Sequence, residues 1–184
     1  LFYTILITPA FYLFLITIRD FISMKLKNLS QNIAHFGFSL LILSILFNNI
    51  LSTETITNLK VGETFQAKNY KINFESIDQE ERKNFQSFIA KFNIENSDGS
   101  IEILKPELRV YNQPNIITSE ADIKTNLFRD KFITINVVQN QEYYNVRYQI
   151  KPLMVWIWLS VLLISLGGLT SLIKKNMKNK VSSL

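Results

Sequence analysis

The chain has 184 residues and a formal net charge of +5, with one histidine and no cysteine. This length allows one or two domains. The lack of cysteine excludes disulfide bonds, thiolate metal sites and cysteine nucleophiles from the chain. Net positive charge is common in nucleic-acid-binding proteins and also beside membrane spans. The positions of the charged residues distinguish these two classes.

The positive charge is concentrated in two short segments beside apolar runs. Residues 19–28 and 174–180 together carry seven Lys or Arg residues and one Asp, a net charge of +6. Residues 52–151 carry 13 basic and 14 acidic residues and are nearly neutral. Lys and Arg gather on the cytoplasmic side of membrane spans, whereas nucleic acid requires a basic face on a folded domain. The charges therefore predict a membrane topology and no nucleic-acid partner.

Residues 1–18 are uncharged and rich in Leu, Ile and Phe, which predicts most of a transmembrane helix. The apolar run starts at Leu1 with no charged segment ahead of it, so it does not read as a signal peptide. We expect a truncated or processed product, with a kink at Pro9. The basic loop at 19–28 is expected on the cytoplasmic side.

Residues 29–51 contain no charged side chain and predict a second transmembrane helix. His35 lies inside this helix, about 9 Å from its cytoplasmic end by helical rise. An ionisable side chain at membrane depth usually has a partner, so His35 is the candidate functional residue. Helical spacing predicts Ser39, Ile42 and Leu46 on the same face.

Small and aromatic residues surround His35 in the sequence. Gly37 and Ser39 are small enough for a neighbouring helix or a flat ligand to approach closely, and Phe36 and Phe38 add aromatic bulk. Metal or heme ligation is one role that this pattern allows. A hydrogen bond to another helix, a side chain reaching the headgroups and a proton relay are the alternatives.

Residues 52–151 are polar, with period-two apolar runs that predict a mainly β domain outside the membrane. The turn NSDGS around Gly99 predicts a hairpin. The segment 119–128 predicts a short helix capped by Ser119. Alternating runs begin at Tyr70, Phe88 and Tyr144, and residues 132–138 are rich in β-branched side chains.

No catalytic constellation is found in the sequence of the β domain. It has no histidine or cysteine, and its acidic residues are too scattered to predict a metal site. Glu80 and Glu81 adjoin Arg82 and Lys83, which is typical of a solvated loop. The sequence predicts no catalytic residue, and it favours a scaffold or docking role for this domain.

Residues 152–173 are uncharged and predict the last transmembrane helix, followed by a cytoplasmic tail at 174–184. Trp156 and Trp158 are expected at the headgroup interface, and Gly167 and Gly168 permit close helix packing. The predicted fold class is a membrane protein with about three transmembrane α-helices. A mainly β extracytoplasmic domain is inserted before the last helix.

Four blocks of the sequence carry a resemblance to a known family. They are NIAHFGFSLLILS (32–44), LKPELRVYNQPNIITSEADI (104–123), LFRDKFI (127–133) and RYQIKPLMVWIWLSVLLISLGGL (147–169). In content and order they resemble the C-terminal part of the CcmF-type cytochrome c maturation subunit, the membrane heme lyase component. The resemblance covers about residues 28–173.

The resemblance implies a role for His35, which matches the histidine of the family's "AHxG" helix. That histidine is one of two axial ligands of a membrane-embedded heme b. His35 is therefore expected to bind heme iron, and heme b is the expected cofactor. A neutral imidazole can bind iron in an apolar site without adding a buried charge.

The chain also departs from the family pattern. The second membrane histidine, two histidines outside the membrane and a Trp-rich heme-handling loop are not in this sequence. Lys131 and Phe132 replace a family Leu-Tyr after Arg-Asp, which leaves the role of that block open. The resemblance therefore implies that the thioether chemistry is not carried by this segment.

The leading expectation is a portion of a heme lyase subunit that holds heme b and presents heme for attachment to apocytochrome c. Its expected partners are membrane lipids, apocytochrome c, a heme chaperone and an apocytochrome-handling subunit. The expected location is the bacterial inner membrane with a periplasmic domain, or alternatively the mitochondrial inner membrane. The alternative function is a membrane-anchored scaffold whose β domain docks a partner without heme.

Overall fold

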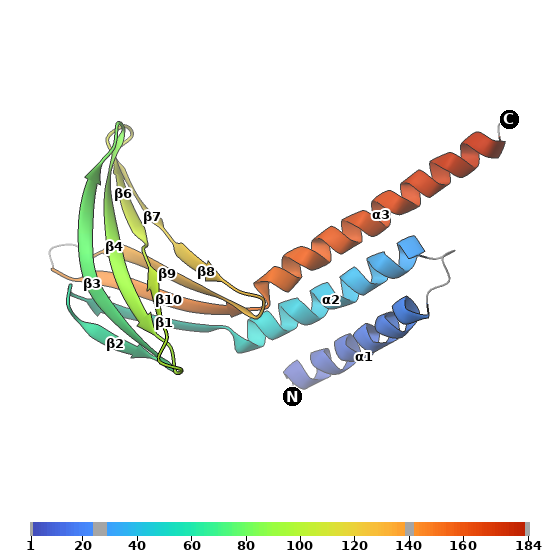
Figure 1. Ribbon diagram of the computed structural model, residues 1–184, viewed down its shortest axis with the longest axis horizontal. Helices are drawn as coiled ribbons and strands as arrows, with labels where there is room; N and C mark the ends of the chain where they lie inside the picture. The colour runs from blue at the N-terminus through green and yellow to red at the C-terminus, as the bar shows by residue number, and fades with distance from the viewer. Residues whose placement is uncertain (1, 24–28, 139–141, 183–184) are drawn as a thin grey trace. The chain divides into compact units, whose positions relative to one another are not determined.

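The computed structural model describes residues 2–23, 29–138 and 142–182, with side chains described within 5–23, 29–138 and 142–174. This described part has three helices and ten strands (Figure 1). It divides into two compact units. The helix unit comprises residues 1–52, 126–129 and 152–184, and the strand unit comprises 53–125 and 130–151. The predicted fold class is confirmed.

The helices are α1 (Phe2–Ile22), α2 (Leu29–Leu51) and α3 (Met154–Ser182), and each is long and apolar enough to cross a membrane. Helix α2 covers the same residues as the predicted span. The other two continue beyond their apolar runs, so 174–182 of the expected tail is helical. Arg and Lys are good helix formers, so a helix need not end where its hydrophobicity does. Most of the expected basic loop, 24–28, lies outside the described residues.

The strand unit contains two antiparallel sheets. One has the order β1-β10-β9-β8, and the other has the order β2-β3-β4-β6-β7 with β5 also paired to β4. The strands are β1 (Thr53–Leu59), β2 (Thr64–Ala67), β3 (Tyr70–Glu81), β4 (Phe85–Glu95), β5 (Ile101–Leu104), β6 (Glu107–Tyr111), β7 (Ile116–Glu120), β8 (Asp122–Thr125), β9 (Arg129–Val137) and β10 (Tyr144–Pro152).

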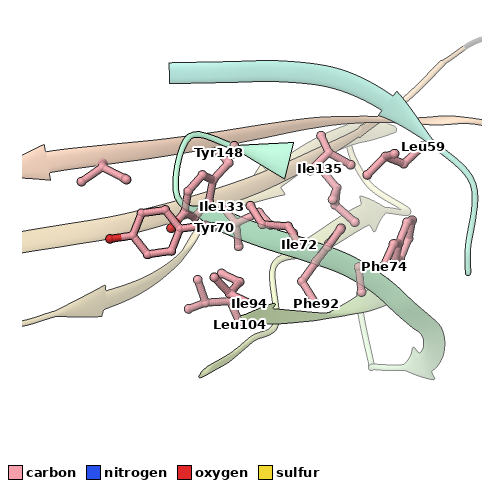
Figure 2. Close-up of a cluster of buried hydrophobic side chains, with 14 of the residues drawn as sticks. Leu59, Tyr70, Ile72, Phe74, Phe92, Ile94, Leu104, Ile133, Ile135 and Tyr148 are labelled. Atoms are coloured by element: carbon pink, nitrogen blue, oxygen red, sulfur yellow. The ribbon is translucent and has the colours of Figure 1, made fainter. Parts of the chain in front are cut away.

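Apolar side chains from both sheets form one core (Figure 2). Phe74 of β3 and Phe92 of β4 are fully buried and stack with ring centroids 4.5 Å apart. The alternating runs predicted from the sequence supply the inward faces of β3, β4 and β10, and the β-branched segment at 132–138 supplies that of β9. The buried members from these strands are Tyr70, Ile72, Phe74, Ala90, Phe92, Ile94, Ile133, Ile135, Val146, Tyr148 and Ile150.

The predicted hairpin around Gly99 is confirmed, and the predicted helix at 119–128 is wrong. Gly99 has a φ of +79° in the turn that joins β4 to β5. Residues 116–125 form strands β7 and β8 instead of a helix. The Ser119 hydroxyl donates to the carbonyl of Ile135 at 2.7 Å, and the Asp122 carboxylate accepts from Lys105 N–H at 2.6 Å. These partners are distant in sequence, so a local capping pattern could not reveal them.

The two ends of the strand unit lie side by side, because β1 and β10 pair antiparallel with Thr53 opposite Ile150. Domains whose ends are close together can often be excised. We expect residues 53–151 expressed alone to give a β-dominated circular dichroism spectrum, to unfold cooperatively in urea and to bind no heme. A random-coil spectrum would show that the core requires the helices, and stoichiometric heme binding would place the heme site elsewhere than at His35.

Candidate functional site

Helix α2 packs against both other helices (Figure 1). Toward α1, the ring of Phe36 lies 5.7 Å from that of Phe14 and 5.4 Å from that of Phe21. The hydroxyls of Ser39 and Thr17 share a hydrogen bond at 2.7 Å, and both residues are buried. Ring stacking and a hydroxyl pair thus fix this side of α2 against α1.

Toward α3, two glycines allow the helices to approach closely. A Cβ on Gly37 would lie 2.9 Å from the Cβ of Leu163, and one on Gly167 would lie 2.8 Å from the Cβ of Ala34. The close approach predicted at these glycines is therefore confirmed. At Gly37 the neighbour is a helix, so this position is not open to a flat ligand. Gly168 is different, because a Cβ there would meet nothing within 4 Å.

This difference gives a matched pair of substitutions. We expect Gly167→Ala to lower the stability of the α2–α3 pairing by about 1–3 kcal/mol, as overpacking does elsewhere. Gly168→Ala gains the same helix propensity without a clash, so it should be neutral or stabilising. Thermal unfolding of the detergent-solubilised chain, followed by helical circular dichroism, compares the two. Equal melting temperatures would contradict the close approach.

His35 lies on a third face of α2, and its side chain is exposed. The imidazole forms no hydrogen bond within the part of the chain that the structure describes. Exposed residues continue along this face at helical spacing, and Phe38 and Ile45 are 53% and 49% exposed. We call Gln31, His35, Phe38, Ile45 and Asn49 the open face of α2.

Ser39 lies one turn from His35 on α2 as the spacing predicts, but the two have different surroundings, because Ser39 is fully buried against α1. A step of four residues advances about 40° beyond a full helical turn. That rotation is enough to carry Ser39 from the open face to the α1 contact.

The open face would offer a heme one imidazole ligand and an apolar surface. An imidazole is a common ligand of heme iron, and the exposed ring of Phe38 and side chain of Ile45 offer apolar contact beside it. The described residues contain no group of three or more His, Asp or Glu arranged to hold a metal ion. His35 is the only histidine in the sequence, so a second imidazole would come from outside this chain. An exposed imidazole beside apolar side chains is a donor set that fits a heme, for which His35 would be one ligand.

The strand unit contains a buried charge that the sequence reasoning missed. The Lys131 side chain is 3% exposed, and its Nζ donates to the Glu102 carboxylate at 2.8 Å and to Asn96 Oδ1 at 2.6 Å. The same Nζ lies 4.6 Å from the ring centroid of Tyr70. The spacing of residues in β9 could have predicted this burial. Lys131 precedes the inward-facing Ile133 by two residues and therefore lies on the same face of the strand. We call Tyr70, Asn96, Glu102 and Lys131 the Lys131 cluster. Its hydrogen bonds join β9 to the β4–β5 hairpin.

The neighbouring carboxylates Glu80 and Glu81 are solvated and do not face each other as a buried pair. Glu80 and Glu81 are exposed, and Glu80 pairs with Arg82 at 2.6 Å. They are solvated as predicted, although they end strand β3 and do not lie in a loop.

Asp130 has a different environment, because it is 7% exposed and its Oδ1 has no hydrogen-bond partner among the described residues. Burial raises the pKa of this carboxyl, although a hydrogen bond with Thr125 opposes the shift. A raised folded-state pKa gives stability below the unfolded value of about 3.9, and this stability is lost as pH rises through the folded value. We expect Asp130→Asn to raise the free energy of unfolding at pH 7 by about 1 kcal/mol, and to have little effect near pH 3.

Asp98 provides the control for this pH dependence. Hydrogen bonds from Ser100 lower the pKa of the Asp98 carboxyl, so its contribution is present at neutral pH and lost on acidification. Asp98→Asn should therefore destabilise the domain at pH 7 and become neutral at low pH. Urea unfolding across the pH range measures both variants, and trends of the same sign would contradict the assignment.

Comparisons with known proteins agree with this architecture. The model of the CcmF C-terminal beta-sandwich matches residues 50–152. The chain is 28% identical to the cytochrome c-type biogenesis protein CcmF of Pseudomonas fluorescens, over 83% of this chain and 23% of that protein. It is 26% identical to CcmF of Escherichia coli (strain K12), over 81% of this chain and 23% of that protein.

A solved structure shows the same fold. The structure named Cytochrome c Heme Lyase CcmF matches 78% of this chain and 24% of its own, with a TM-score of 0.60 and 20% identity. The chain spans roughly a quarter of the length of the curated relatives it matches. The chain belongs to the CcmF family of cytochrome c-type biogenesis proteins and carries the C-terminal β-sandwich of that family.

Proposed function

We propose that this chain supplies His35 as an axial ligand of a b-type heme in a membrane heme lyase subunit. The observation that carries the proposal is the position of the chain's one histidine on the open face of α2. An imidazole at membrane depth without a partner is costly, and coordination to iron satisfies it. The family membership supports the same role, because the similar solved structure is named a heme lyase.

The rest of the helix unit positions this ligand. The Ser39–Thr17 hydrogen bond and the stacking of Phe36 fix the rotation of α2 against α1. The contact at Gly37 fixes α2 against α3. With two sides of α2 occupied, the imidazole is presented on the third. When bound, the heme would supply a redox-active iron, and His35 is the residue of this chain that would hold it.

The wider function that we propose is presentation of heme for attachment to apocytochrome c. The strand unit is then a periplasmic docking domain, and the basic ends of the helices lie in the cytoplasm of a bacterial inner membrane. A heme chaperone and an apocytochrome-handling subunit are the proposed partners. The thioether bonds form outside this chain, because its strand unit contains neither histidine nor cysteine.

A membrane-anchored scaffold without heme is the second candidate. Buried aromatic and aliphatic side chains fill the core of the strand unit. This favours the scaffold function, because the unit then offers its outer surface for docking rather than an interior reaction centre. In that case His35 forms a hydrogen bond to a helix outside this chain. The absorption spectrum of the assembled subunit with and without His35 separates the two functions, as argued below.

A further inference from the structure

The short turn between β8 and β9 is a rigid apolar tip. Asn126 N–H donates to the carbonyl of Arg129 at 3.1 Å, and Asn126 Oδ1 accepts from the N–H groups of Phe128 and Arg129, both at 2.9 Å. These bonds close the turn and leave Leu127 and Phe128 at its end, 61% and 71% exposed. Turns that face water usually carry small or polar residues, so two large apolar side chains here are unusual.

The tip is tied to the first turn of α3. Leu153 N–H donates to the carbonyl of Phe128 at 2.9 Å, and Trp156 Nε1 donates to the carbonyl of Leu127 at 2.8 Å. Residues 126–129 accordingly belong to the helix unit and not to the strand unit. The position of the tip is therefore fixed relative to the start of a candidate membrane span.

Two observations indicate a membrane boundary at that start. The candidate span in α3 runs from Met154, and the span in α2 ends at Leu51. The side chain of Asn48 donates to the carbonyl of Pro152, so the two spans reach the same level at these ends. Trp158 is 66% exposed near this end of α3, and indole rings favour the headgroup interface.

We propose that Leu127 and Phe128 form an interfacial anchor that inserts into the lipid headgroup–acyl boundary beside the start of α3. The occupant that covers these side chains is the bilayer that α3 crosses. Exposed apolar side chains next to interfacial tryptophans have the chemistry that lipid at this depth accepts. The anchor holds the β8–β9 turn on the membrane surface at which α2 ends and α3 begins.

Nitroxide depth measurements on the full chain in phosphatidylcholine nanodiscs test this proposal. The chain has no cysteine, so Phe128→Cys carries one label. Leu162→Cys is the matched control, because Leu162 is 60% exposed on α3 and lies about 12 Å further along the helix than Met154. Collisions with oxygen report lipid, and collisions with a water-soluble nickel chelate report water.

We expect the oxygen-to-nickel collision ratio at position 128 to exceed that of the free label in buffer and to be lower than that at position 162. Nickel access at position 128 equal to that of the free label would overturn the anchor, because the tip would then face water. Low access to both reagents would also overturn it, because a protein surface would then cover the tip.

A second variant tests the tie to α3. Trp156→Phe keeps an aromatic ring and removes the N–H donor to Leu127. We expect the ratio at position 128 to fall toward the value in buffer, while the ratio at position 162 stays unchanged and shows that the helix is still inserted. An unchanged ratio at position 128 would overturn the role of the Trp156 hydrogen bond in holding the anchor.

Discussion

His35→Ala is expected to remove or strongly alter the b-type heme spectrum of the assembled subunit and to lower cytochrome c maturation. The reason is geometric, because His35 is exposed on the open face of α2 and no other histidine in the sequence can replace it. The measurement is the reduced-minus-oxidised absorption spectrum of the purified complex, normalised to protein. Added imidazole should restore part of the spectrum, since it can enter the vacated coordination position. His35→Cys should retain some heme with a shifted spectrum, because thiolate is also an axial ligand.

The control for this experiment is Ser39→Ala, one turn along the same helix. Ser39 contributes a hydrogen bond to Thr17, and its loss should cost about 0.6 kcal/mol, the average for hydrogen bonds between membrane helices. The heme spectrum should stay unchanged in this variant, because the contacts of Phe36 with Phe14 and Phe21 still hold α2 against α1. If His35 were only a hydrogen-bonding residue, His35→Ala would behave like Ser39→Ala. An unaltered spectrum in His35→Ala at normal protein levels would end the ligand proposal.

The sequence alone predicted the elements that depend on local pattern. The uncharged run at 29–51 predicted α2, and the alternation from Tyr70 to Phe74 predicted an inward-facing strand. Periodicity encodes such features directly. The same uncharged run made His35 the candidate residue, because an ionisable side chain at membrane depth usually has a partner. The run could not show which faces of α2 the other helices cover.

Features that depend on partners distant in sequence were missed. Ser119 begins a plausible helical cap, yet its hydroxyl bonds to Ile135 in another sheet. Ser39 follows His35 by four residues, yet Thr17 of α1 buries it. The role of the apolar tip at Leu127 and Phe128 could not be inferred from the sequence. It depends on the hydrogen bonds from Trp156 and Leu153 that hold the tip at the start of α3. In each case a tertiary contact overrides or completes the local pattern.

Lys131→Met is expected to lower the free energy of unfolding of the strand unit by about 3 kcal/mol, the lower end of the cost of breaking a buried ion pair. Methionine fills the space that the lysine stem leaves, so the loss does not come from a cavity. It comes from the carboxylate of Glu102, which is 26% exposed, and from the amide of Asn96, because both lose the ammonium that they contact. The partial exposure of Glu102 places the estimate at the low end. Urea unfolding of residues 53–151 measures the change.

Two further variants separate the charge from the packing. Adding Glu102→Gln to Lys131→Met should recover part of the stability, because no uncompensated charge then remains in the cluster. Arg82→Met removes the surface pair with Glu80, whose side chains are 59% and 47% exposed, and should change stability by less than about 1 kcal/mol. If Lys131→Met had no larger effect than Arg82→Met, the ammonium would be hydrated in solution. If the double variant were less stable than Lys131→Met alone, the loss would come from packing around the cluster and not from an unpaired carboxylate.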